Sequence, residues 1–288
     1  MTRASTLGLA AIAAALTAAT AARAQDSERW TWSGSVARGR LLEVRGIQGS
    51  IRAEPVSGGT VEVTALKHGH HEDPADVRIE VVEHDEGVTI CAVYPGRRNT
   101  CEPGGGQMNL RHNDVEVDFQ VRVPAGVRFE GFQVSGDVEV SGLTAGVTAS
   151  SVSGDVLVRD ARGDVSGHSV SGSVTLERVD GLEVSGQTIS GDVDFSGPIR
   201  DDGRYRFKSL SGDVEVRADG ELNADVSFST FSGDFESDFA ITLNRRGRVH
   251  RRSFESTVGS GGARLALESF SGTIYLRRSG ARGAREER

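Results

Sequence analysis

The chain contains 288 residues, with 37 glycines, two cysteines, 6% aromatic residues and a formal net charge of −8. The hydrophobic share of 37% is enough to bury a core, which excludes a chain that is disordered by composition, and two cysteines are too few for a small disulfide-rich scaffold. Glycine is about twice as frequent as usual. This excess requires a structural explanation.

The first 24 residues are typical of a secretory signal peptide. Arg3 precedes an apolar, Ala-rich stretch over 7–22, and Ala22-Arg23-Ala24 forms a small-x-small cleavage site. We expect cleavage after Ala24 and export to the periplasm or the cell surface. A membrane anchor fits less well because the stretch is short and Ala-dominated, and we expect no integral membrane segment after cleavage. The mature chain would remain acidic and is not expected to bind nucleic acid.

The two cysteines, Cys91 and Cys101, lie on either side of a turn-rich segment. An exported chain meets an oxidising compartment, which favours their pairing. Closing so short a loop would stabilise the fold by about 3 kcal/mol. A redox-active pair is the alternative, but that chemistry usually shows Cys-x-x-Cys spacing. We therefore predict a structural disulfide.

A five-residue phrase with Ser-Gly at its centre recurs through the second half of the chain. Its serines are separated by 18, 18, 19, 21, 21 and 39 residues, and we expect one degenerate copy inside the last gap. The segment 47–51 resembles an isolated earlier copy. The seven copies span residues 134–138, 152–156, 170–174, 189–193, 210–214, 231–235 and 270–274.

Each copy is flanked by residues that alternate between apolar and polar. Pairs such as Val138/Val140 follow the phrase, and pairs such as Val147/Ala149 precede it. This period of two indicates two short strands per repeat, each with one buried face. The alternation changes parity across the phrase, because the apolar positions after it are shifted by one residue relative to those before it. We therefore expect the chain to bend or slip by one residue between the two sets. We place the slip at the row Ser151, Ser169, Thr188, Ser209, Thr230 and Ser269.

The pattern predicts an all-β fold, a β-solenoid of short strands with about 18–21 residues per coil. The apolar positions of the repeat would form interior ladders, and glycine would occupy a corner that requires positive φ or close backbone approach. Asp and Ser beside it would hydrogen-bond nearby backbone amides. The predicted corner residues are Gly136, Asp137, Gly154, Asp155, Gly172, Gly191, Asp192, Gly212, Asp213, Gly233, Asp234 and Gly272.

Residues 25–130 are less regular, and we predict that they form an N-terminal β section and cap continuous with the solenoid. Residues 77–81 and 88–93 alternate around a turn, and 115–123 form a long alternating strand. The repeat solenoid would then occupy 131–278 and be followed by a disordered tail over 279–288.

Two groups of residues raise the question of metal binding. His68, His70 and His71 form the densest cluster of candidate metal ligands, although Asp73-Pro74 indicates a solvated turn. The corner aspartates would stack along one edge and offer oxygen ligands to calcium, but corner capping explains them without a metal, and Ser173 and Thr273 replace two of them. We expect no metal and no cofactor.

An enzyme that acts on acidic polysaccharides is the principal alternative class. It would need carboxylates and basic side chains on one face, and the comparable gathering is Asp201, Asp202, Arg204, Arg206 and Lys208. Their alternation with Tyr205 and Phe207 fits an exposed strand better than a catalytic site. The arginine-rich stretch 245–252 is interpreted as a solvated loop that could contact anionic glycans or lipid headgroups.

The Ser-Gly-Asp-Val phrases, the segment 87–95, Val123-Pro124-Ala125-Gly126 and the closing segment 261–265 resemble the bacterial putative-adhesin family. This resemblance covers roughly residues 30 to 278 and implies an exported β-strand-repeat domain of unknown function. It implies no catalytic residues.

We therefore expect a non-enzymatic exported β-solenoid that presents sheet faces to an envelope protein or glycan. A polysaccharide-acting β-helix enzyme and a purely structural envelope protein are the alternatives.

Overall fold

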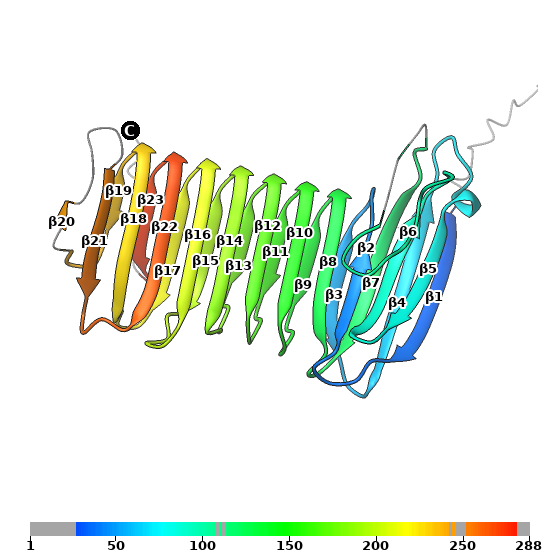
Figure 1. Cartoon of the computed structure of the whole chain (residues 1–288), viewed down its shortest axis with the longest axis horizontal. Coiled ribbons are helices and arrows are strands. Elements are labelled where there is room, and N and C mark those ends of the chain that lie inside the picture. The colour runs from blue at the N-terminus through cyan, green and yellow to red at the C-terminus, as the bar shows by residue number, and fades with distance from the viewer. Residues whose placement is uncertain (1–26, 107–109, 111–112, 242–243, 246–251, 281–288) are drawn as a thin grey trace, which may run out of the picture.

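The computed structural model describes residues 27–106, 110, 113–241, 244–245 and 252–280, which are almost entirely β-structure (Figure 1). The predicted signal peptide, most of the arginine-rich stretch and residues 281–288 lie outside the described residues. Among the described residues, one short 3-10 helix, η1 (Pro74–Asp76), interrupts the strands.

The described strands form two sheets. The first, which we call the 11-stranded sheet, has the order β1 (Ser27–Ser35), β4 (Thr60–His68), β7 (Glu116–Pro124), β3 (Ile51–Val56), β9 (Val138–Ser141), β11 (Val156–Arg159), β13 (Val174–Glu177), β15 (Val193–Pro198), β17 (Val214–Asp219), β23 (Ile274–Arg278), β19 (Phe235–Ser237). The second, the 12-stranded sheet, has the order β20 (Asn244–Arg245), β21 (Arg252–Val258), β18 (Ala224–Ser232), β22 (Ala263–Ser271), β16 (Arg204–Ser211), β14 (Glu183–Ser190), β12 (Val165–Ser171), β10 (Val147–Ser153), β8 (Arg128–Ser135), β2 (Leu41–Arg45), β6 (Gly87–Val93), β5 (Arg78–His84).

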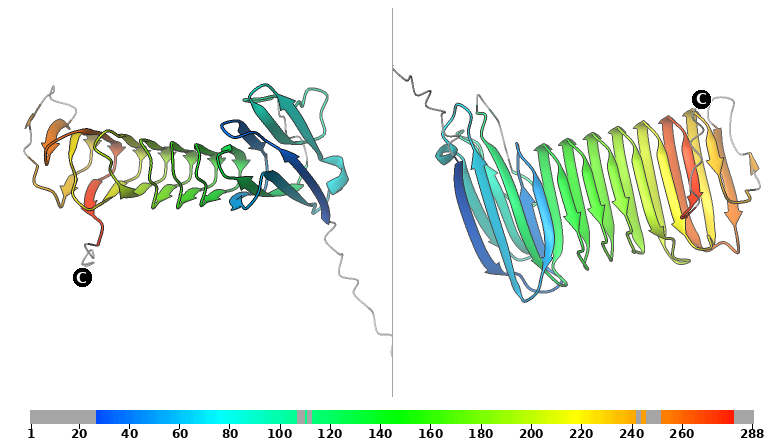
Figure 2. Two further views of the ribbon diagram at one scale, coloured as in Figure 1. Left: turned by 90° about the horizontal axis from the view of Figure 1, so that it is seen from below. Right: turned by 180° about the vertical axis from the view of Figure 1, so that it is seen from behind.

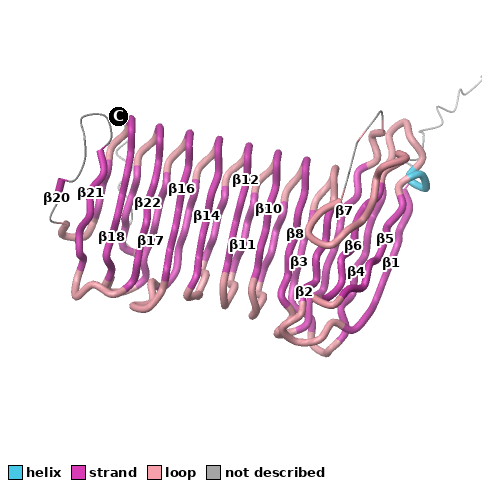
Figure 3. The backbone as a smooth tube through the Cα atoms, in the orientation of Figure 1, coloured by secondary structure: helices cyan, strands magenta, loops and turns pink. Residues whose placement is uncertain are grey.

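Each regular coil contributes one strand to each sheet, and the two sheets face each other along an elongated stack (Figures 2 and 3). Equivalent positions of successive coils pair in parallel. Val147 of β10 lies beside Val165 of β12, and Val156 of β11 lies beside Val174 of β13. The predicted all-β solenoid is confirmed.

Apolar side chains from both sheets fill the narrow interior between them. The ladder that follows the corners is fully buried, and each such side chain stabilises the fold by about 1.5–3 kcal/mol. Its members are Val138, Val156, Val174, Val193, Val214 and Ile274. Aromatic rings also fill this interior, where Phe195 stacks on Phe207 with their centroids 4.9 Å apart.

The predicted position of the parity change is wrong. Ser151, for example, is buried and continues the inward row of Val147 and Ala149. The change comes after it, at the corner between Ser153 and Val156. A small hydroxyl side chain fits the interior here because it finds a hydrogen-bond acceptor in the preceding coil, as described below.

The predicted interior position of the first apolar residue in each phrase is also wrong. Because the inward row runs through the Ser or Thr at the preceding position, this residue points outward. Val170, Ile189 and Leu210 are 42%, 48% and 43% exposed.

The degenerate coil expected between residues 232 and 271 is absent from the described residues. The chain instead passes through β21, which pairs antiparallel with β18, and then returns as β22 and β23. Strand β22 pairs with β16 on one side and β18 on the other (Figure 1). The last copy of the phrase therefore lies spatially between the two copies that precede it in sequence.

The N-terminal section carries the features expected of its strands. Strands β5 and β6 form the predicted antiparallel pair, and β7 is the long strand before the repeats. Strands β2 and β3 pair in parallel with β8 and β9, so residues 47–51 are the first copy of the corner. Both sheets contain strands from before and after residue 130. The division of the chain into two sections at this residue stays a prediction.

Candidate functional site

The corner glycines allow the coils to stack closely. Gly191 has a φ of 146°, and a Cβ atom there would overlap the carbonyl oxygen of Gly172 in the coil below. The same contact with the preceding corner repeats along the stack, with φ between 131° and 158°. Its other members are Gly136, Gly154, Gly172, Gly212, Gly272 and Gly233. This close approach explains much of the glycine excess.

Two kinds of side chain complete each corner. The buried hydroxyl row donates hydrogen bonds of 2.8 to 3.0 Å to the preceding corner's glycine carbonyl, from Ser151, Ser169, Thr188, Ser209 and Ser269. The corner carboxylates accept the backbone N–H at the equivalent position of the next coil at 2.7 to 2.8 Å, at Asp137, Asp155, Asp192 and Asp213. These aspartates therefore hydrogen-bond each corner to the next corner along the stack.

A groove of about 740 Å³ runs along the outer face of the 12-stranded sheet, crossing strands from β2 to β22. Its floor consists of short outward side chains, including Thr148, Ser166 and Ser185. The Oγ atoms of Ser166 and Ser185 are 2.8 Å apart, so neighbouring strands share hydrogen bonds along this floor. A second hollow of about 430 Å³ adjoins the groove over β22, β18 and β21.

Charged side chains of both signs line this groove. Glu130 and Asp164 lie over β8 and β12, whereas Arg206 and Arg264 lie over β16 and β22. Burial, and next the nearby charge of Glu43, raise the pKa of Glu130. The groove therefore offers hydroxyl, carboxylate and guanidinium groups along one line, which suits an elongated polar ligand.

Outward apolar side chains form a second feature of the same sheet, beside the corners. We call this set the apolar row: Val134, Val152, Val170, Ile189, Leu210, Phe270 and Phe231, in stacking order. The first two are half-buried, and the last two are 51% and 52% exposed. The rings of Phe270 and Phe231 stack with centroids 4.8 Å apart and planes 2° from parallel. The alternation in the sequence did not predict this surface, because an apolar residue in a strand usually faces the core.

The disulfide loop covers the outer face of the 12-stranded sheet near the groove. Cys91 and Cys101 are bonded, with their Cα atoms 5.7 Å apart. The loop's Gly104 N–H donates to Glu43 Oε2 at 3.0 Å, and the Thr89 hydroxyl donates to the same oxygen at 2.7 Å. Glu43 is fully buried. Its carboxylate thus fastens the loop to the sheet.

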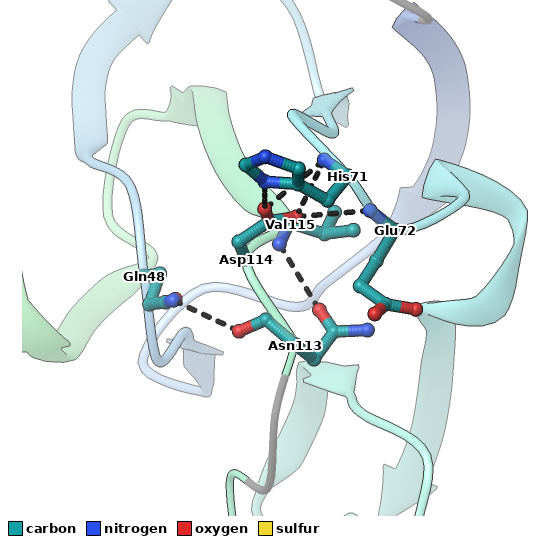
Figure 4. Close-up of polar contacts among 6 residues, drawn as sticks. All are labelled: Gln48, His71, Glu72, Asn113, Asp114 and Val115. Carbon is teal, nitrogen blue, oxygen red and sulfur yellow. Dashed lines mark hydrogen bonds and ion pairs between the residues drawn. The ribbon is translucent and has the colours of Figure 1, made fainter.

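The histidine cluster is divided between separate acidic partners. His71 Nδ1 lies 2.7 Å from Asp114 Oδ2, and this contact lowers the pKa of the Asp114 carboxyl (Figure 4). His68 Nε2 lies 3.9 Å from Asp118 Oδ2, and His70 is exposed. In the part of the chain that the structure describes, no three His, Cys, Asp or Glu side chains gather as metal ligands would.

The residues of the enzyme alternative do not converge on one point. Arg204 pairs with Glu183 at 2.6 Å, and Lys208 pairs with Glu268 at 3.6 Å. The groove includes Arg204 and Arg206, whereas Asp201 and Asp202 lie in the turn before β16 and do not line it.

Comparison with known proteins identifies the repeat region. Residues 168–277 match the family model described as Toastrack DUF4097. The resemblance to a β-strand-repeat family of unknown function is confirmed there. No curated protein matches the sequence.

Two solved structures show a weaker likeness. A putative cell adhesion protein from Clostridium sporogenes has 12% identity and a TM-score of 0.34, with 87% of this chain and 100% of that chain covered. A putative adhesin from Bacteroides fragilis has 12% identity and a TM-score of 0.38, with 86% and 97% covered. TM-scores this low do not establish a common fold. Within the described residues, no helix has the length and apolar character needed to cross a bilayer.

Proposed function

We propose that this chain is an exported, non-enzymatic binding module whose 12-stranded sheet presents its outer face to an envelope protein or glycan. The observation that carries the proposal is the groove, which crosses seven strands from β2 to β22. Seven strands spaced by about 4.8 Å span about 29 Å, so the groove matches an extended ligand better than a compact one.

The chemistry of the groove supports binding along its length. Short hydroxyl side chains leave room for a ligand chain and offer hydrogen bonds at each strand. Thr148, Ser166 and Ser185 repeat this environment on three successive strands. The disulfide between Cys91 and Cys101 is in keeping with export to an oxidising compartment.

A pair of matched variants tests this proposal. Thr148→Trp places a bulky ring in the groove, whereas Thr175→Trp places the same ring on the outer face of the 11-stranded sheet, in the next coil. Glycan arrays and envelope pull-downs would compare both with the unaltered protein, and thermal melts would check that both fold. We expect ligands retained by the unaltered protein and by Thr175→Trp to be lost by Thr148→Trp.

Other outcomes of the same experiment would contradict the proposal. A ligand that binds Thr148→Trp as well as the unaltered protein would exclude the groove. Failure to retain any ligand would favour a purely structural envelope protein. Release of new reducing ends from an acidic polysaccharide such as polygalacturonate would instead favour the enzyme alternative.

A further inference from the structure

We propose that the apolar row joins two copies of this chain, with the solenoids side by side and antiparallel. This inference goes beyond the proposed function because it concerns self-association through other residues of the same sheet. The row lies beside the corners, at the ends of the strands in the 12-stranded sheet, whereas the groove lies near their beginnings. A contact through the row therefore uses none of the residues that line the groove.

The size of the side chains changes steadily along the row. From Val170 the row continues through Ile189 and Leu210 to Phe270 and Phe231. Two copies in parallel would place Phe on Phe at one end and Val on Val at the other, leaving a wedge. Two antiparallel copies place the large end of one row on the small end of the other, so the combined thickness stays even and the side chains can pack closely.

The spacing of the row also fits a second copy. Successive members lie on adjacent strands, as the pairing of Ser153 with Ser171 and of Ser211 with Ser271 shows for their neighbours. The strand spacing of about 4.8 Å is therefore the same in both copies. A second copy thus matches the row at every rung. We place Leu210 at the two-fold axis because it is the middle of the five most exposed members, which puts Val170 opposite Phe231 of the other copy.

The area of this contact sets its strength. Five rungs at about 4.8 Å, with a width of about 12 Å for the row and its outward neighbours, give about 290 Å² per copy. The total of about 600 Å² is well below the roughly 1,200 Å² at which stable interfaces begin. We therefore expect weak, reversible association.

The corner aspartates give this association a distinctive salt dependence. The carboxylates of Asp192 and Asp213 lie three residues after Ile189 and Leu210. In the antiparallel arrangement the corners of both copies lie on the same side, so these carboxylates repel one another. Screening by salt lowers that repulsion and should strengthen the contact, in contrast to one held together by opposite charges.

Variants with one added cysteine test the orientation. Val170→Cys and Phe231→Cys would be made in separate chains of different tag mass, oxidised alone or mixed, and the new disulfides mapped by mass spectrometry. We expect the mixture to yield mainly the mixed disulfide between residues 170 and 231. Predominant 170–170 and 231–231 disulfides would overturn the antiparallel arrangement.

Sedimentation velocity over a concentration series tests the surface. We expect Leu210→Glu to weaken self-association at least tenfold, and Leu157→Glu, on the outer face of the 11-stranded sheet, to leave it unchanged. Added salt should strengthen it in the unaltered protein. A monomer at every concentration, or equal effects of the two variants, would overturn the proposal. Thr148→Trp should self-associate normally, which separates this result from that of the groove.

Discussion

The stacked coils and the N-terminal section are stabilised by different kinds of contact. In the coils, the same few contacts recur between each pair of neighbouring coils. The most important of them is the close backbone approach at glycine corners such as Gly191. In the N-terminal section, single contacts occur once each. Tyr94 donates its hydroxyl to the Val115 carbonyl at 2.7 Å, and buried Lys67 donates to the Val77 carbonyl at 2.9 Å.

This difference indicates where each region is most sensitive. A repeat stack is stabilised by each coil and by its interfaces with its neighbours, so a change that separates two rungs removes an entire interface. The N-terminal section depends more on individual buried polar groups and on one covalent link.

The largest effect is expected at a corner glycine. Gly191→Ala places a methyl group against the Gly172 carbonyl and also forces alanine to adopt positive φ. We expect a loss of about 4 kcal/mol in the free energy of unfolding, the upper range for single substitutions. Denaturant unfolding would measure it.

Gly220 is the control for that substitution. It also has positive φ, at 75°, but open space surrounds its Cβ position. Gly220→Ala should cost about 1–2 kcal/mol from backbone strain alone. Equal losses at both positions would show that backbone strain, and not rung contact, makes the corners sensitive.

The disulfide should give the next largest effect, this time in the N-terminal section. Cys91→Ala with Cys101→Ala removes the cross-link that closes the loop over Glu43. The loop-entropy estimate gives a loss of about 3 kcal/mol, and hydrogen exchange should rise over residues 94–106 before it rises in the coils. Reduction of the unaltered protein should have the same effect. Faster exchange first in the coils would contradict the separation of the two regions.

The hydroxyl row allows a finer test within the coils. Ser209 is buried and donates to the Gly191 carbonyl at 2.8 Å. Ser209→Ala leaves that acceptor without its donor and should cost about 1–1.5 kcal/mol. Exposed Ser211 is the control, and Ser211→Ala should change stability by less than about 0.5 kcal/mol. A loss at Ser211 as large as that at Ser209 would show that the inward hydroxyls have no special role.

The sequence predicted the repeated parts of this fold well because its signals recur. Seven corner phrases at similar spacing specify coils, and alternation specifies strands such as those that begin at Val147 and Val156. The buried Ser169 was harder to place, since a hydroxyl is favourable inside only when an acceptor from another coil lies within reach. That acceptor, the Gly154 carbonyl, is fixed by stacking and not by local sequence.

The order of the last coils and the apolar row could not be predicted for related reasons. Strand β22 can pair with β16 as well as with β18 because both present the same register, and sequence order gives no preference. Leu210 is apolar and belongs to a strand, so its pattern alone favours the core. Its exposure follows from Ser209, which occupies the inward position before the corner.

The smallest expected effect is a charge effect where the two regions meet. Glu130 is half-buried on β8, next to Glu43 of β2, and burial together with that charge raises its pKa. A carboxyl whose pKa is higher in the folded state than in the unfolded state destabilises the fold when ionised. This penalty is fully present above the folded-state pKa and disappears below the ordinary Glu value of about 4.3.

Glu130→Gln should therefore stabilise the protein at pH 7 and leave it unchanged at pH 4. Since the side chain is partly solvated, we expect the Tm at pH 7 to rise by only about 1–2 °C, as a few tenths of a kcal/mol would give. Glu139→Gln is the matched control, because Glu139 pairs with Arg52 at 2.9 Å on the other sheet and its neutralisation removes an attraction. A lower Tm for Glu130→Gln at pH 7 would mean that Arg45 and Arg128 outweigh Glu43 and burial, so that the junction stabilises this charge in the folded state.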